Sequence, residues 1–171
     1  MALGLALKAA VAGGRRPIVD NARLAKTLEQ RLDVWRELVR RNNVGITEVA
    51  TFSYVIEHGT RYEWADDQAL SSIDERFTIP KRCFENASRL AESDADLTYV
   101  EGLAWTTAGW PTQHAWVQTT DGVVIDPTWQ TRGKAYIGIP ISDPGPIQAD
   151  CGTYDVLDWI AHQRIDPSTL A

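Results

Sequence analysis

The sequence predicts an α+β domain in which helices come first and an antiparallel β-sheet follows. Up to about residue 93, apolar residues recur at three- and four-residue steps, which is typical of amphipathic helices. After residue 96, short runs rich in β-branched and aromatic residues are separated by turn residues, which is typical of strands. The length of 171 residues suits one domain, so we expect a single unit over residues 1–171.

The helical part begins with an N-terminal extension over residues 1–45. Its strongest pattern lies between residues 20 and 41, where Leu24, Leu28, Leu32, Trp35 and Val39 form one apolar stripe. We expect further helices over residues 2–12, 47–58 and 82–93, and a short one near 66–73. Glycine ends the first two of these, at Gly13 and Gly59.

The sheet part contains four predicted strands and one clear hairpin signal. The strands are expected at Thr98–Trp105, Gln113–Thr119, Val123–Asp126 and Ala135–Ile141. Asp121-Gly122 marks the turn between the second and third of these. The segment 143–146 is expected to be a loop, and residues 155–163 a short final helix.

Charge and composition exclude several classes of function. The net charge is −6, which argues against a nucleic-acid-binding surface. The N-terminus lacks the basic region of a signal peptide, and no run approaches the roughly 20 apolar residues that cross a bilayer. With two cysteines only, a disulfide framework is not expected. These features predict a cytoplasmic protein without a membrane partner.

Cys83, His114 and Asp126 carry the chemistry that we expect. Cys83 is predicted to lie in the first turn of the helix 82–93, where unpaired backbone N–H groups favour a thiolate, the reactive form of cysteine. His114 lies on a predicted strand and Asp126 ends the next one. A histidine can pair with a thiolate and later donate a proton, and an acid behind the ring fixes its orientation.

The hairpin between His114 and Asp126 has a geometric requirement. Side chains alternate between the two faces of a strand, so a plain two-residue turn at Asp121-Gly122 would place the pair on opposite faces. We therefore predict an odd number of connecting residues, or a bulge, which would let His114 face Asp126 directly across the ladder.

The segment His114–Trp129, HAWVQTTDGVVIDPTW, resembles the His–Asp hairpin of transglutaminase-like proteins, a branch of the papain-like cysteine enzymes. The helix Arg82–Glu92, RCFENASRLAE, matches the position of the family's nucleophilic cysteine. The resemblance covers about residues 80–141 and implies a catalytic core there, with Cys83, His114 and Asp126 as its triad. Arg82 and Phe84 stand where well-studied members carry small residues, and Gln68 is a candidate oxyanion donor.

Tryptophans surround the predicted triad. Trp110, Trp116 and Trp129 are candidates for walls of a substrate cleft, although strand aromatics are more often core residues. Cys151 has no catalytic setting and is expected to be a buried apolar residue.

The function expected from these residues is that of a cysteine hydrolase or acyltransferase. Cys83 would attack an amide or ester of a protein, peptide or small-molecule substrate and form a thioester, which water or an amine would resolve. The reaction needs no cofactor. Two alternatives stay open: a non-catalytic binding module on the same fold, and a zinc site formed by Cys83, His114 and Asp126. The substrate and the oligomeric state are not predicted.

Overall fold

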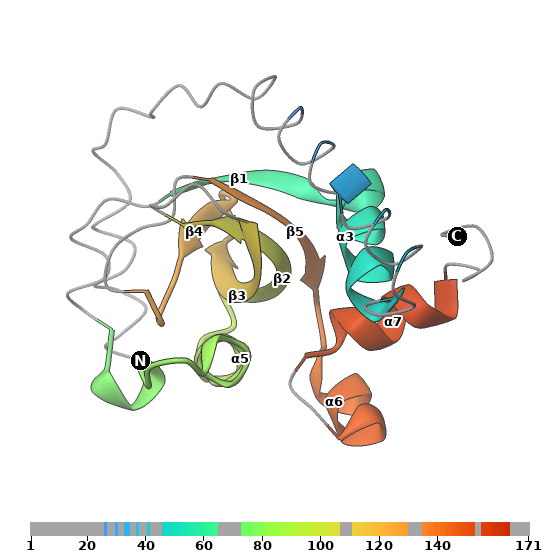
Figure 1. The fold of residues 1–171 in the computed structure, drawn as a ribbon. Coiled ribbons are helices and arrows are strands. Elements are labelled where there is room, and N and C mark those ends of the chain that lie inside the picture. The colour runs from blue at the N-terminus through green and yellow to red at the C-terminus, as the bar shows by residue number, and fades with distance from the viewer. Residues whose placement is uncertain are drawn as a thin grey trace.

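The structure is a computed structural model that describes residues 46–64, 73–106, 111–129, 135–152 and 155–164, together with isolated helical positions between 26 and 41. The elements follow in the order α3 (Ile46–His58), β1 (Thr60–Trp64), η1 (Glu75–Phe77, a 3-10 turn), α5 (Cys83–Ser93), β2 (Leu97–Trp105), β3 (Pro111–Thr119), β4 (Val123–Ile125), β5 (Tyr136–Ile141), α6 (Gly145–Cys151) and α7 (Leu157–Arg164) (Figure 1). The helices expected over residues 2–12 and 66–73 lie outside the described residues.

Five strands curl into a small closed barrel in the order β1–β4–β3–β2–β5. Neighbouring strands are antiparallel except β1 and β4, which are parallel. The predicted α+β class is confirmed, but the expectation of helices first and a wholly antiparallel sheet was wrong in two respects, the early position of β1 and its parallel pairing with β4. Strand β1 precedes α5 in the chain and pairs with both β4 and β5, thereby closing the barrel.

The interior of the barrel is filled by aromatic side chains. Trp116 has no exposed surface and packs with Tyr62 and Tyr136, whose rings meet it edge-on at centroid distances of 5.7 and 5.1 Å. Gly138 makes room for this ring, because a Cβ atom there would lie 2.6 Å from the Trp116 side chain. The absence of a side chain at residue 138 therefore lets a tryptophan occupy a five-stranded barrel.

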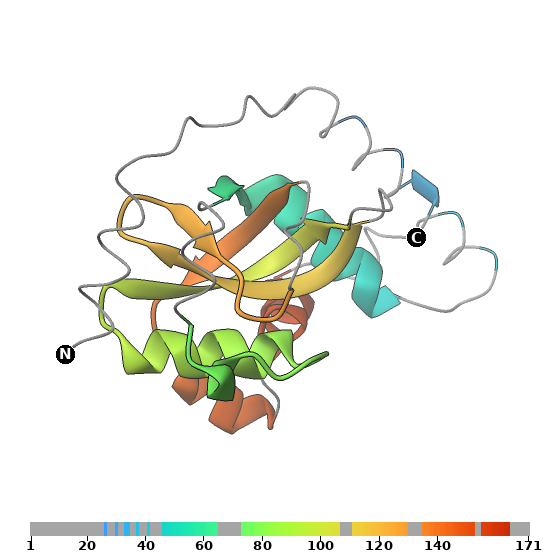
Figure 2. The same ribbon diagram turned by 90° about the vertical axis from the view of Figure 1, so that its left-hand side faces the viewer.

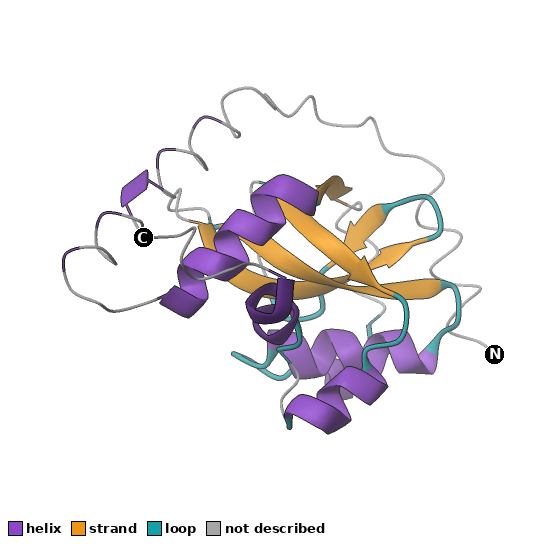
Figure 3. Ribbon diagram, turned by 90° about the vertical axis from the view of Figure 1, so that its right-hand side faces the viewer, coloured by secondary structure: helices purple, strands orange, loops and turns teal. Residues whose placement is uncertain are grey.

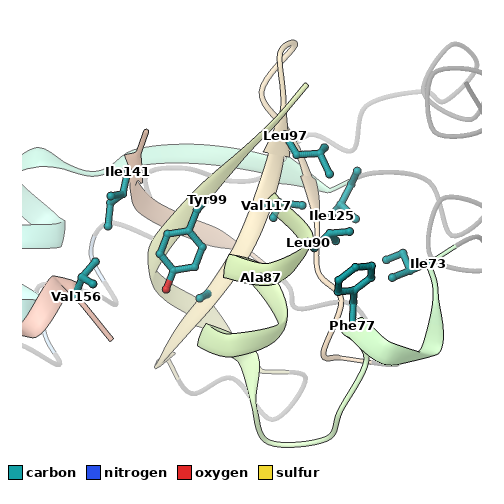
Figure 4. Packing of buried hydrophobic residues seen from close by; sticks show 11 residues of the cluster. Ile73, Phe77, Ala87, Leu90, Leu97, Tyr99, Val117, Ile125, Ile141 and Val156 are labelled. Carbon is teal, nitrogen blue, oxygen red and sulfur yellow. The ribbon is translucent and has the colours of Figure 1, made fainter. Parts of the chain in front are cut away.

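Helices cover the outer faces of the barrel. Helix α5 lies against β2 and β3, and its buried residues Ala87 and Leu90 pack beside Tyr99, Val117 and Ile125 (Figures 2 and 4). Helices α3 and α7 pack against each other, and α3 also contacts β2 and β5 (Figure 3). The barrel thus has a separate apolar cluster beneath each group of helices.

Two elements differ from the sequence-based expectation. Residues 143–146 were expected to be a loop, yet helix α6 begins at Gly145, with a proline in its first turn. Proline is tolerated there because the first N–H groups of a helix have no intrahelical acceptor. Helix α7 begins at Leu157, two residues later than predicted. The four predicted strands are present within two residues of their expected bounds.

None of the helices in the described ranges has the length and apolar character needed to cross a membrane.

Candidate active site

Helix α5 presents Cys83 as its first residue, as predicted. Arg82 is the N-cap residue and its side chain makes no capping hydrogen bond, so the backbone N–H groups of the first turn receive no side-chain cap. The chain enters the helix through Lys81, which has a left-handed backbone with φ of 64°. Cys83 is half-buried and its thiol is free. A partly accessible thiol therefore stands at the positive end of a helix dipole.

His114 and Asp126 form a buried pair at one end of the barrel. His114 Nε2 lies 2.6 Å from Asp126 Oδ2, and the two residues are 2% and 1% exposed. Because Nε2 faces the carboxylate, Nδ1 is the ring nitrogen left for Cys83. The Cys83 side chain lies close enough to His114 to raise the pKa of the imidazole. The structure thus brings together the three residues that the sequence singled out.

The β3–β4 hairpin has the odd connection that this pair requires. Gln118 pairs with Val124, so Thr119 and Val123 face each other and three residues, 120–122, connect the strands. Gly122 has φ of 76°, and its N–H donates to the carbonyl oxygen of Thr119. The prediction of an odd connection is confirmed.

The same register corrects one detail of the predicted geometry. If the pairing of β3 with β4 is continued past Ile125, Asp126 falls opposite Trp116, two residues along the strand from His114. His114 and Asp126 therefore share a face but lie diagonally. Asp126 reaches the ring because it follows the strand, where the chain turns away.

The sequence Asp-Pro-Thr-Trp explains how the Asp126 carboxylate is held. Its Oδ1 accepts the backbone N–H groups of Thr128 and Trp129, at 2.9 and 3.1 Å. This is the local turn that aspartate favours, and Pro127 lacks an N–H group that could compete. Oδ2 accepts the hydroxyl of Tyr136 at 3.1 Å and faces His114. Both carboxylate oxygens are thus bound and oriented.

The electrostatics of the pair favour a protonated imidazole. Burial lowers the pKa of His114. The charge of Asp126, the hydrogen bond to it and the nearby Cys83 raise this pKa by more than burial lowers it, and the result is about 9. Trp129 stacks on the ring, with centroids 4.2 Å apart and planes at 28°. The ring is therefore shielded from water and carries a proton at neutral pH.

The other predicted site residues have different positions. Trp129, half-buried above His114, is placed where it can form part of a cleft wall. Trp116 is fully buried inside the barrel, so of its two expected roles it has the more common one, that of a core side chain, and it is not a cleft wall. Trp110 and Gln68 lie outside the described residues. Cys151 ends α6, far along the chain from the triad.

Three site residues escaped the sequence reasoning: Tyr136, Asn86 and Thr128. Asn86 is 1% exposed and donates through Nδ2 to Thr128 Oγ1 at 2.9 Å. Asn86 follows Cys83 by three residues, which places it near the same face of the helix, and this spacing was a usable signal. No local pattern marks Tyr136, because its contact with Asp126 depends on how β5 joins the barrel.

A second buried acid lies on the outer face of β2. Glu101 has no exposed surface and accepts the Tyr99 hydroxyl at 2.6 Å and the N–H groups of Val156 and Leu157 at 2.9 and 2.8 Å. Burial raises the pKa of Glu101 well above its ordinary range, and the nearby Asp155 adds to the effect. Glu101 therefore binds the start of α7 to the barrel.

The described parts of the chain contain no group of three or more His, Cys, Asp or Glu side chains arranged to hold a metal ion. A cavity of about 400 Å³ lies at the hairpin end of β3 and does not include the triad. Its lining residues are Thr60, Arg61, Tyr62, Gln118, Asp121, Gly122, Val123 and Pro140.

Comparison of the chain with models of known families, with curated proteins and with solved structures found no match.

Proposed function

We propose that this protein is a cysteine-dependent hydrolase or acyltransferase that acts on an amide or ester bond. Cys83 is the nucleophile and His114 is the general acid and base. Asp126 orients the imidazole and stabilises its protonated form. One observation carries the proposal: a buried His114–Asp126 pair, with Nε2 and Oδ2 2.6 Å apart, lies beside a free cysteine at a helix start that raises the pKa of the imidazole. The resemblance of His114–Trp129 to the transglutaminase-like hairpin supports the same assignment.

The acylation step uses the protonated imidazole. The Cys83 thiolate attacks the substrate carbonyl carbon, a C–S bond forms, and the carbonyl electron pair moves onto oxygen. Backbone N–H groups of the first turn of α5 are suited to this oxyanion, because Arg82 does not cap them. The C–N or C–O bond then breaks as the His114 imidazolium gives its proton to the leaving amine or alcohol.

The second step regenerates the thiolate. Water or an amine attacks the thioester, neutral His114 takes the proton of this nucleophile, and Cys83 leaves as thiolate beside a protonated ring. Water makes the protein a hydrolase, and an amine makes it a transferase. Asp126 holds the ring through Nε2, which leaves Nδ1 for the sulfur.

A chromogenic ester tests the proposal without knowledge of the natural substrate. The folded protein is mixed with p-nitrophenyl acetate, and intact-mass and peptide mass spectrometry follow acetylation of Cys83 and Cys151. We expect a burst of p-nitrophenol and an acetyl group on Cys83. Cys83→Ser should remove the burst, and His114→Gln should slow it by about 10²-fold or more, which is the usual contribution of general acid–base catalysis.

The controls separate catalysis from folding. His58→Ala removes an exposed histidine at the end of α3 and should leave the burst unchanged. Near-ultraviolet circular dichroism checks that His114→Gln keeps its tertiary packing. Equal acetylation of Cys83 in the wild type and a folded His114→Gln variant would refute the assignment, as would acetylation confined to Cys151.

A further inference from the structure

Asn86 connects the nucleophile helix to two other segments. It lies one turn after Cys83 in α5 and is 1% exposed. Its Nδ2 donates to the carbonyl oxygen of Ile79 at 2.7 Å, and its Oδ1 accepts the N–H of Ile79 at 3.3 Å. The same Nδ2 donates to the hydroxyl of Thr128 at 2.9 Å. One buried amide thus holds both the entry to α5 and the loop after β4.

Thr128 connects this amide to the acid of the triad. Its Oγ1 receives Asn86, while its backbone N–H donates to Asp126 Oδ1 at 2.9 Å. These neighbours form a closed cycle: Cys83 and Asn86 share α5, Asn86 binds Thr128, Thr128 binds Asp126, Asp126 binds His114, and Cys83 lies close enough to His114 to raise its pKa. Any change in the distance between α5 and the loop after β4 must therefore lengthen the weakest contact of this cycle.

The contact between Cys83 and His114 is where that stretch should appear. The Asp126–His114 pair is a charged hydrogen bond of 2.6 Å, and the Asp126 turn is local in sequence. The sulfur–imidazole contact, in contrast, joins α5 to β3. The Asn86–Thr128 bond spans 42 residues of sequence and directly ties the same helix to the acid loop.

We propose that the Thr128 hydroxyl is a positioning group that, through Asn86, fixes the separation between Cys83 and the His114–Asp126 pair. The inference rests on the proposed function for its catalytic meaning, but the geometry that it describes is testable without any catalysis. The hydrogen bonds of Thr128 join it to Asn86 and Asp126, so it acts through the neighbours that it binds.

Thr128→Val is the informative variant, because it removes the hydroxyl, keeps the shape and leaves the backbone N–H to Asp126 in place. Thr128→Ser restores the hydroxyl. Thr78→Val is the matched control, since the Thr78 hydroxyl donates a hydrogen bond to the carbonyl oxygen of Glu75, which is not part of this cycle of contacts. Each variant is compared by thermal unfolding, so that a general loss of stability is measured separately.

The first readout is the titration of His114, followed by NMR of the imidazole carbon-bound protons. In the wild type the pKa of His114 is about 9, partly because Cys83 lies near it. We expect Thr128→Val to lower this pKa towards its ordinary value, and Thr128→Ser and Thr78→Val to leave it unchanged. This readout does not require that Cys83 be a nucleophile.

The second readout is the rate at which iodoacetamide alkylates Cys83 at about pH 6, divided by the rate at about pH 8.5, the ordinary pKa of a thiol. We expect Thr128→Val to lower this ratio about fivefold, the loss that one net hydrogen bond allows. A purely structural role would lower the melting temperature and leave both readouts unchanged, and that result would overturn the inference. If the His114 titration shifts while the wild-type ratio is that of an ordinary thiol, the positioning role stands and the proposed enzyme activity falls.

Discussion

Replacing Asp126 by asparagine should remove a large pH-dependent part of the stability of this protein. The variant keeps the side-chain shape and keeps an oxygen for the N–H groups of Thr128 and Trp129. It removes the negative charge that lies 2.6 Å from His114 Nε2. Without that charge, burial dominates, and the pKa of His114 should fall to its ordinary value of 6.5 or lower.

The expected magnitude follows from the His114 pKa. In the folded wild type this pKa is raised from 6.5 to about 9, and one pH unit corresponds to about 1.4 kcal/mol. Protonation of His114 thus contributes about 3 kcal/mol to the free energy of unfolding. Because the folded pKa is the higher one, this stability is fully present below pH 6.5 and is lost as the pH rises through about 9. At 2% exposure of His114, solvent screening reduces the value little.

Urea unfolding followed by tryptophan fluorescence measures the effect at about pH 6 and about pH 9.5. Other groups titrate over this range, so the informative quantity is the difference between wild type and variant. Asp121→Asn, at an exposed position of the hairpin, is the control and should follow the wild type. Between the two pH values, we expect the free energy of unfolding of Asp126→Asn to fall by about 3 kcal/mol less than that of the wild type. Parallel pH dependence in the wild type and Asp126→Asn would refute the charged His114–Asp126 pair.

Three further substitutions test other contacts of the barrel. Tyr136→Phe removes a hydroxyl donor from the carboxylate beside His114, which should raise the pKa of His114 above about 9 in an NMR titration; a fall would contradict the assigned hydrogen bond. Gly138→Ala places a Cβ atom 2.6 Å from Trp116 and should cost about 1–3 kcal/mol by overpacking, so an unchanged melting temperature would show that the ring can move. Glu101→Gln leaves one buried N–H donor at the start of α7 without an acceptor and should cost about 1–3 kcal/mol in urea unfolding; a near-zero cost would mean that water replaces the lost acceptor.

The features that the sequence predicted well are those encoded over a few residues. Four strands follow from local patterns of β-branched and aromatic residues, and the position of Cys83 follows from the helical spacing after it. The odd β3–β4 connection followed from a physical constraint, because period-two alternation allows His114 and Asp126 to share a face only with an odd connection.

The features that were missed depend on contacts distant in sequence. Strand β1 was not predicted, because its five residues lie in a polar stretch and their pairing with β4 and β5 is a property of the closed barrel. The prolines of residues 143–146 predict a loop, but Pro144 only precedes helix α6 and a proline in the first turn is compatible with a helix. Tyr136 reaches Asp126 only after β5 has joined the barrel.

The burial of the His114–Asp126 pair itself favours an enzyme over a binding module. Two ionisable groups with 2% and 1% exposure lose most of their hydration, and apolar residues of similar volume often replace such pairs without loss of stability. The protein instead surrounds Asp126 with two backbone N–H groups, a tyrosine hydroxyl and an imidazolium, and covers that ring with a stacked tryptophan. A barrel end built only for packing needs none of these donors. In the proposed mechanism the ring gives a proton to the leaving group and takes one from the second nucleophile, and these contacts hold it in place while the charge on the imidazole changes.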